Sequence, residues 1–421
     1  MRHIQIKPLF PDKNTEFEDL KMKKVIVIFL CALLSFSFIL SATSCNSSEG
    51  ENSTDAEKTD APTDAPTDAP TDAPTDAPTD KPTDKPTDAP KPLVPSTYSL
   101  FDDWRSFKPY GRVEFVLEGI VCDATASGIE FTGYMKGVVE VEIDCSDDTY
   151  FTVFIDEERV EERLFADSST EFLTIADFGD EAGEHTIRFL KQTEPQWSLT
   201  LIKNVVVTGY IDENPPYDKD YYIEFIGDSL TTGYGNLGDS RSEDPGTAIW
   251  QDGTKTYAFL ACEELYADYT IAACSGVGID EGWTNFSMKD FYPAASYYRD
   301  KKDAHYEART PDLIVINIGT NDQDRGSSKA AFVQGVKDLI TSLRETYNED
   351  VKIIWAYNLG GYGCDDWAFE AIEALGGEAN GIYLLRMTYN NSGANGHPDL
   401  EGHVTAKDEL VSFIKEKKLL A

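Results

Sequence analysis

The sequence predicts an α/β domain built on a five-stranded parallel sheet, preceded by an all-β sandwich. Between Tyr98 and Tyr210, short segments alternate apolar with polar residues and are separated by turn residues, as is typical of a β sandwich. After Tyr221 the chain alternates nearly continuous apolar strands with helices. Such strands are buried on both faces, so the second region predicts a parallel sheet covered by helices on both sides, an α/β/α sandwich.

The elements of the two regions follow from their periodicity. The sandwich segments are RVEFVLEGIV, GIEFTGYM, VVEVEID, YFTVFID, HTIRFLK and SLTLIKNVVVTG. The strands expected in the parallel sheet are 222–226, 270–274, 313–318, 352–357 and 382–386. One helix between the third and fourth strands has its apolar residues on one face, namely Phe332, Val336, Leu339, Ile340 and Leu343. We place the sandwich at 96–215 and the α/β domain at 216–421.

The first 45 residues have the pattern of an export signal. Met22-Lys23-Lys24 is a charged region, and the apolar run from Val25 to Leu40 has signal-peptide length. A transmembrane helix is the alternative, but the run is shorter than the roughly 20 residues that a span needs. Cys45 follows small residues and resembles a bacterial lipobox cysteine, although Ala42 stands where Leu is usual. We expect lipidation at Cys45, with plain secretion as the alternative.

Residues 46–95 are predicted to be a disordered linker. From Thr59 to Pro90, Thr-Asp-Ala/Lys-Pro repeats without interruption. Few apolar residues, regular proline and surplus acid predict an extended tether that cannot form a core. Its expected role is to hold the folded region away from the surface in which Cys45 is anchored.

The charge and the cysteines exclude several classes of function. The formal net charge is −38, which repels nucleic acid and anionic lipid. It is consistent with a neutral or cationic substrate, and equally with a surface charge that only keeps the protein soluble outside the cell. Five cysteines follow Cys45, an odd number without C-x-x-C spacing, so neither a disulfide framework nor a zinc site is indicated. Cys122 and Cys145 are the pair for which a bridge is considered.

Candidate catalytic residues follow the ends of four expected strands. Ser229 follows the first, Gly276 the second, Asn321 the third and His397 the fifth. Ligands of such sheets bind beyond the carboxyl ends of the strands. Acyl transfer needs a nucleophile, a base and oxyanion donors. Ser229 would attack and His397 would move its proton. The N–H groups of Ser229 and Gly276 and the Asn321 amide would form the oxyanion hole.

These blocks, GDSL, SG, GTND and HP, resemble in order and context those of the SGNH or GDSL hydrolase superfamily. The preceding GIEFTG, YFTVFID and GEHTIRFLKQTEPQWSLTL resemble the amino-terminal domain of carbohydrate esterase family 2. The resemblance implies an SGNH, flavodoxin-like α/β domain behind a jelly-roll-like sandwich. It also implies an extracellular deacetylase of acetylated plant polysaccharides such as xylan and glucomannan, with no metal or organic cofactor.

One position departs from the superfamily pattern. Most members have an Asp three residues before the histidine to orient the imidazole, and here that position is Ala394. The resemblance implies a Ser-His dyad in which a backbone carbonyl accepts from the other ring nitrogen. A neutral acceptor stabilises the imidazolium less than a carboxylate does, so we expect a less basic histidine. Asp399 is the second choice for this role.

Other interpretations remain open. Ser229 could be only a helix cap, His403 could be the base, and His403 with Asp399 could belong to a metal site, although no third ligand has familiar spacing. Sugar stacking needs aromatic faces; the strand-connecting segments supply Tyr234, Trp283, Tyr362, Trp367 and Tyr389, of which Tyr362 and Trp367 are the candidates. Alternative functions are a lipid or aryl-ester esterase and a non-catalytic carbohydrate-binding surface lipoprotein.

Overall fold

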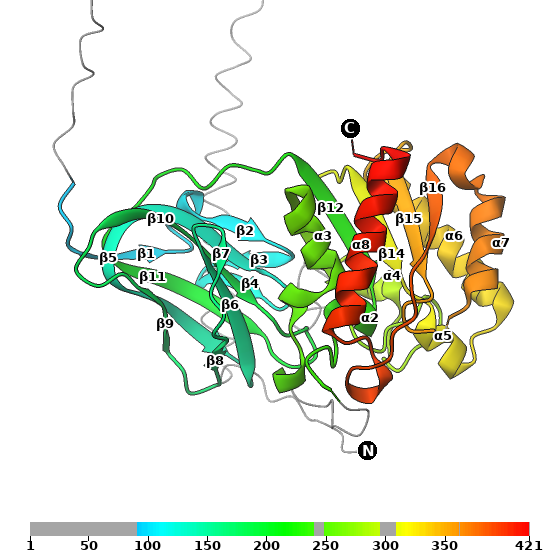
Figure 1. The fold of residues 1–421 in the computed structure, drawn as a ribbon, viewed down its shortest axis with the longest axis horizontal. Coiled ribbons are helices and arrows are strands. Elements are labelled where there is room, and N and C mark those ends of the chain that lie inside the picture. The colour runs from blue at the N-terminus through cyan, green and yellow to red at the C-terminus, as the bar shows by residue number, and fades with distance from the viewer. Residues whose placement is uncertain (1–90, 240–247, 295–308, 362, 421) are drawn as a thin grey trace, which may run out of the picture. The chain divides into compact units, whose positions relative to one another are not determined.

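The computed structural model describes residues 91–239, 248–294, 309–361 and 363–420 (Figure 1). The predicted export signal, Cys45, most of the predicted linker and Tyr362 lie outside the described residues. Among the residues described, no helix is long and apolar enough to cross a membrane.

The first folded region, which we call the β domain, is all-β, as predicted, and its strands pair antiparallel. Its strands are β1 (Pro95–Ser99), β2 (Lys108–Tyr110), β3 (Val113–Val116), β4 (Gly119–Cys122), β5 (Gly128–Cys145), β6 (Thr149–Ile155), β7 (Glu158–Arg159), β8 (Leu164–Ala166), β9 (Phe172–Asp177), β10 (Gly183–Lys191) and β11 (Thr200–Ile211), with a 3-10 turn η1 (Trp104–Ser106). They form one branched sheet in which β5 pairs with β2, β9, β10 and β11. This branching lets the sheet enclose its own apolar core.

The long strand β5 joins two segments that the sequence suggested as separate strands, GIEFTGYM and VVEVEID. Gly137 lies between them at φ 66°, and the pairing register with β11 and β9 shifts on the residues that follow it. A glycine in the left-handed region permits this irregularity without interrupting the strand.

Cys122 and Cys145 do not form a bridge, and both are buried free thiols. The two residues pair with Thr200 of β11 from opposite sides. They are therefore separated by two strand spacings of about 4.8 Å each. That separation exceeds the roughly 7 Å limit between the Cα atoms of a disulfide.

The second region, which we call the α/β domain, contains the predicted parallel sheet in the order β13-β12-β14-β15-β16. Its strands are β12 (Tyr221–Gly227), β13 (Ala267–Ala273), β14 (Leu313–Asn317), β15 (Lys352–Tyr357) and β16 (Ile382–Arg386). Its helices are α2 (Ser229–Thr232), α3 (Tyr257–Leu265), α4 (Met288–Phe291), α5 (Thr320–Arg325), α6 (Lys329–Thr346), α7 (Asp365–Ala374) and α8 (Leu400–Lys417), with 3-10 turns η2 (Ala248–Trp250), η3 (Gly253–Lys255), η4 (Gly377–Asn380) and η5 (Ala394–Gly396).

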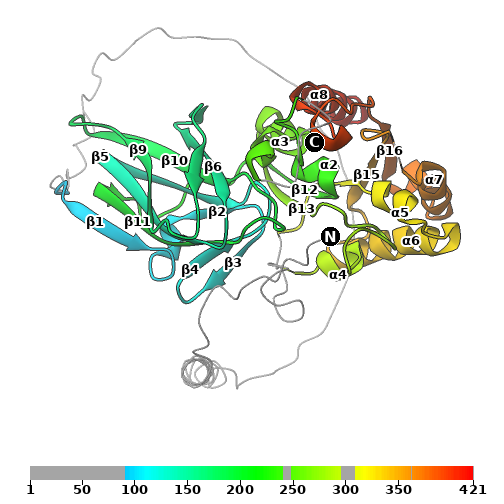
Figure 2. The ribbon, with the colours of Figure 1, turned by 90° about the horizontal axis from the view of Figure 1, so that it is seen from below.

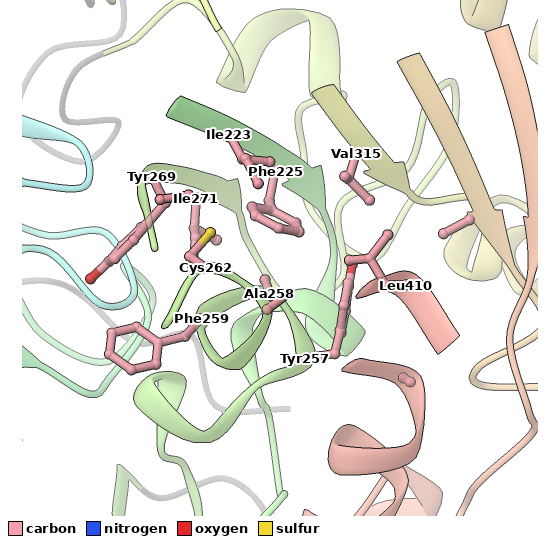
Figure 3. Close-up of a cluster of buried hydrophobic side chains, with 14 of the residues drawn as sticks. Ile223, Phe225, Tyr257, Ala258, Phe259, Cys262, Tyr269, Ile271, Val315 and Leu410 are labelled. Atoms are coloured by element: carbon pink, nitrogen blue, oxygen red, sulfur yellow. The ribbon is translucent and has the colours of Figure 1, made fainter. Parts of the chain in front are cut away.

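Helices cover both faces of this sheet. Helices α3 and α8 pack on one face, and α4, α6 and α7 pack on the other (Figure 2). Figure 3 shows the first core, where Phe225 and Val315 of the sheet face Tyr257 of α3 and Leu410 of α8. The apolar face predicted for the third helix is the buried face of α6. The two layers fix the strand ends from which the candidate site is built.

The β domain and the α/β domain share buried contacts. Tyr110 and Leu190 of the β domain belong to the same apolar cluster as Phe225. Arg188 of β10 makes a bidentate pair with Glu263 of α3, at 2.9 and 2.6 Å. Arg112 pairs with the fully buried Glu224 in the centre of β12, at 3.2 Å. Through these contacts the β domain packs against the parallel sheet of the α/β domain.

Candidate active site

Ser229 is presented by a tight turn between β12 and α2. The strand ends at Gly227, where a Cβ atom would lie 2.1 Å from Oγ1 of Thr231, so only glycine fits. Asp228 caps the helix by accepting from the N–H of Leu230 at 3.0 Å. The residue that caps the helix is therefore Asp228, and Ser229 is the first helical residue with its side chain free for another role.

His397 lies beside Ser229. Its Nε2 is 2.9 Å from Ser229 Oγ, a hydrogen-bonding distance suited to proton transfer. The histidine follows η5, where Asn395 adopts φ 53° and the N–H of Gly393 donates to the His397 carbonyl at 2.8 Å. The N–H of Ala394 donates to the carbonyl of Gly235, 2.9 Å away. The loop is thus tied to the segment that follows the nucleophile.

The other ring nitrogen of His397, Nδ1, has no hydrogen-bond partner among the residues described. The carbonyl groups of Asn395 and Ala394 favour the protonated ring, but neither makes a well-directed hydrogen bond to it. Burial has the larger effect and lowers the pKa of His397 to about 4. The expected backbone carbonyl acceptor therefore makes no hydrogen bond to Nδ1 and acts on the ring only through its charge distribution. The pKa of His397 is lowered, as expected, but the chief cause is burial and not the lack of a carboxylate partner.

Asp399 does not take the orienting role. Its carboxylate caps α8 by accepting from the Gly402 N–H at 2.8 Å, and it accepts from the Asn390 side chain at 3.0 Å. His403, the rival base, is fully buried within α8, and its Nδ1 accepts from the backbone N–H of Tyr257 at 3.3 Å. Both side chains thus have structural partners, while His397 is the histidine that reaches Ser229.

Two of the three predicted oxyanion donors are backbone groups. As the first residue of α2, Ser229 has no intrahelical acceptor for its N–H. The N–H of Gly276 donates to no residue in the described part of the chain. Gly276 adopts φ 81°, and a Cβ atom there would lie 3.0 Å from Cβ of Trp283. The glycine therefore satisfies both the backbone conformation and the close packing of the loop.

Asn321, the third predicted donor, is buried between two acceptors. Its Nδ2 donates to the Val277 carbonyl at 2.9 Å and contacts Oδ2 of Asp228 at a longer 3.3 Å. The longer contact is the one that a developing oxyanion could replace. Burial raises the pKa of Asp228 to about 7, opposed by its hydrogen bond from Leu230. The next residue, Asp322, accepts from the N–H groups of Ile279 and Asp280 at 2.8 Å and so fixes the loop after Gly276.

The predicted aromatic positions divide into two groups. Trp367 packs against Phe332 of the apolar core, with ring centroids 6.0 Å apart; Tyr362 is outside the described residues. Trp283 is 61% exposed beside Gly276, and the Tyr234 ring lies 4.7 Å from the ring of His397. The structure thus places Trp283 and Tyr234, rather than Trp367, next to the predicted catalytic groups.

Sequence reasoning missed a contribution from the β domain. Between β10 and β11, Glu194 accepts from the N–H and the Oγ–H of Ser275, both at 2.7 Å. Trp197 stacks on Tyr234 with a centroid separation of 6.1 Å. The signal in the sequence was the segment TEPQW, in which a large aromatic residue and a proline occupy a turn between two strands. Its contact with Ser275 joins positions far apart in the chain, which local pattern does not reveal.

In the described part of the chain, no cluster of three or more His, Cys, Asp or Glu side chains could hold a metal ion. The residues around Ser229 and His397 instead supply a nucleophile, a neutral base and N–H donors. These groups are suited to acyl transfer from an ester substrate.

Comparison with family models gives three matches. Residues 223–395 match the GDSL-like lipase/acylhydrolase model, and residues 110–215 match the carbohydrate esterase 2 N-terminal model. Residues 57–92 match a PT disordered repeat model. The first two matches correspond to the α/β domain and the β domain.

Two curated proteins are similar in sequence. The cellulase/esterase CelE of Acetivibrio thermocellus is 28% identical over 216 residues, covering 48% of this chain and 26% of that protein. An acetylxylan esterase/glucomannan deacetylase of Cellvibrio japonicus is 32% identical over 148 residues, covering 33% of this chain and 40% of that protein. The aligned segments thus span less than half the length of either relative.

Solved structures share the fold. A family two carbohydrate esterase from Clostridium thermocellum in complex with cellohexaose has a TM-score of 0.68 at 23% identity, covering 75% of this chain and 100% of that chain. The acetyl xylan esterase Est2A from Butyrivibrio proteoclasticus has a TM-score of 0.68 at 19% identity, covering 77% of this chain and 99% of that chain. The similarity extends over both domains.

Proposed function

Because the chain joins a carbohydrate esterase 2 N-terminal domain to a GDSL-like acylhydrolase domain, we propose that it is a serine esterase that removes O-acetyl groups from plant polysaccharides. The observation that carries this proposal is the 2.9 Å contact between Ser229 Oγ and His397 Nε2. It unites residues 168 positions apart at the carboxyl ends of the parallel strands.

The reaction proceeds through an acyl-enzyme. Ser229 Oγ attacks the acetyl carbonyl carbon while His397 Nε2 takes the hydroxyl proton, and the N–H groups of Ser229 and Gly276 stabilise the oxyanion. His397 returns the proton to the sugar oxygen as the C–O bond breaks. Water then attacks the acetyl-serine with the same base, which releases acetate and restores Ser229.

Two features favour a carbohydrate ester over a lipid ester. The exposed Trp283 beside Gly276 and the stacked Trp197 and Tyr234 beside His397 provide aromatic faces of the kind on which sugar rings stack. Thr232, which donates to the Ser229 carbonyl, and Ser275, which lies 3.4 Å from Thr232, are buried and polar, unlike the apolar lining of a pocket for a long acyl chain. The names of the relatives, an acetylxylan esterase/glucomannan deacetylase among them, support the same substrate class.

The proposal is tested by acetate release from acetylated xylan, acetylated glucomannan and a short aryl acetate. We expect wild type to act on a polysaccharide and Ser229→Ala to lose nearly all of that activity. Activity confined to aryl or lipid esters would favour the alternative esterase. A wild-type protein that binds glycan but cleaves no ester would replace the proposal with a non-catalytic binding role.

We further propose that the protein is exported and anchored at the bacterial cell surface through a lipid on Cys45, with the Thr-Asp-Ala/Lys-Pro repeats as a spacer. Growth with labelled palmitate tests this directly. Cys45→Ser should lose both the label and membrane association, whereas Cys31→Ser, a cysteine within the apolar run, should retain them. Release of unlabelled wild type into the medium would indicate plain secretion.

A further inference from the structure

We propose that Glu194 of the β domain is a positioning residue for the oxyanion hole, which it aligns through Ser275 and the adjoining Gly276 N–H. The inference rests on the proposed esterase function. Glu194 is fully buried, and its two carboxylate oxygens accept from the N–H and the Oγ–H of Ser275, both at 2.7 Å. Because Ser275 directly precedes Gly276, these two hydrogen bonds fix the Cys274–Ser275 peptide and the Ser275 side chain next to the donor.

The segment that carries Glu194 is itself anchored inside the β domain. The buried ammonium group of Lys191 donates to the carbonyls of Asp123 at 2.9 Å, Thr193 at 2.7 Å and Glu194 at 3.3 Å. Its positive charge also favours the ionised Glu194 carboxylate, which burial opposes. These buried hydrogen bonds hold the backbone around Glu194 in place, so the position of the carboxylate relative to Ser275 is fixed.

Hydrogen bonds from Glu194 also reach the helix that carries the nucleophile. Oγ of Ser275 and Oγ1 of Thr232 lie 3.4 Å apart without a shared proton, because the Ser275 hydroxyl donates to Glu194 and the Thr232 hydroxyl donates to the carbonyl of Ser229 at 3.2 Å. Gln251 donates to the Thr232 carbonyl at 3.0 Å and accepts from the N–H of Glu194 at 3.2 Å. The Glu194 carboxylate therefore holds the residue that precedes the Gly276 donor, and the Glu194 N–H connects through Gln251 to the helix that begins at Ser229.

On the opposite side, Asp322 of the α/β domain holds the same loop after Gly276 through Ile279 and Asp280. The donor glycine thus lies between two carboxylate anchors, one from each domain. The glycine backbone at φ 81° has wide conformational freedom of its own. Loss of either anchor would let the N–H turn away from the oxyanion without unfolding the site.

The test compares Glu194→Ala, Glu194→Asp and Glu194→Gln in the purified protein. Loss of an oxyanion donor lowers kcat by about 10²- to 10³-fold, so we expect Glu194→Ala to lower kcat on an aryl acetate by about 10²-fold. KM should change little, and affinity for a phosphonate transition-state analogue should fall in parallel with kcat/KM. Glu194→Asp, which keeps the charge but is one methylene shorter, should lose about 10-fold, and Glu194→Gln, which keeps the length, only a few-fold.

Glu263→Gln is the matched control, because Glu263 of α3 is also a carboxylate between the two domains but pairs with Arg188 of β10. It should keep kcat within about 2-fold of wild type. A folded Glu194→Ala variant with wild-type kcat overturns the inference. If the alanine variant does not fold, wild-type kcat in Glu194→Asp overturns it. A rise in KM with unchanged kcat also overturns it. A wild type that cleaves no ester overturns the proposed function instead, so the two failures are distinguishable.

Discussion

Among single residues, His397 combines the contact with Ser229 with burial that disfavours its charged form. Burial lowers its pKa to about 4, from 6.5 for an ordinary histidine. The imidazole is therefore neutral, and able to accept the Ser229 proton, at pH values where an exposed histidine is charged. In the proposed mechanism, this weak basicity limits the driving force for proton transfer from Ser229.

This pKa predicts the acid limb of the activity profile. For the free enzyme, kcat/KM should fall with a midpoint near pH 4 as His397 becomes protonated. The folded pKa lies below the unfolded value, so the associated stability is present above pH 6.5 and is lost as pH falls toward 4. Initial rates on an aryl acetate between pH 3 and 8, with folding checked by circular dichroism at each pH, measure this. A midpoint near 6.5 would contradict the buried environment of His397.

Gly276 provides a second prediction. Gly276→Ala should lower kcat by about 10²-fold, because the positive φ and the 3.0 Å approach to Trp283 would move the oxyanion N–H. Gly326→Ala is a matched control, since Gly326 has φ 80° but open space around its Cβ position. The control should lose about 1 kcal/mol of stability with little change in kcat. Equal kcat values in the two variants would show that Gly276 is not part of the oxyanion hole.

At the scale of elements, the start of α8 separates the structural role of Asp399 from a catalytic one. Helix α8 begins at Leu400 because the Asp399 side chain caps it by accepting from the Gly402 N–H. Asp399→Ala should therefore cost about 1 kcal/mol of unfolding free energy and leave kcat within a few-fold. Chemical denaturation and initial rates measure both, with Ser328→Ala, the cap of α6, as the control. A kcat loss of about 10³-fold or more would instead assign the orienting role to Asp399.

The local sequence pattern predicts the bounds of some strands correctly but misses residues whose burial depends on distant partners. Strands β15 and β16 have the predicted bounds because their apolar runs end in clear turns. Strand β13 begins three residues before the predicted start, since Asp268 is buried by its contacts with Lys108 and the N–H of Lys219, and local pattern does not reveal such partners. Glu194 and Trp197 were missed for the same reason, because their partners lie in the other domain.

At the scale of the whole molecule, the described β domain and α/β domain share one buried boundary. Arg112 and Glu224 are both almost completely buried, and each would leave an uncompensated charge if the other were removed. Arg112→Ala should destabilise the protein by about 3–5 kcal/mol. Urea unfolding followed by fluorescence measures this loss. The comparison is Lys329→Ala, which removes the half-exposed ion pair of Lys329 with Glu370 and should cost less than about 1 kcal/mol of unfolding free energy. Similar losses in the two variants would contradict the importance of the boundary.

In the proposed mechanism, Ser229 carries the acetyl group between the two half-reactions. This intermediate can be detected by mixing the protein with an aryl acetate, quenching in acid and analysing the peptides by mass spectrometry. We expect one acetyl group on the peptide that contains Ser229, absent in Ser229→Ala and greatly diminished in His397→Ala. Acetyl transfer to a different residue, or full turnover by Ser229→Ala, would contradict it.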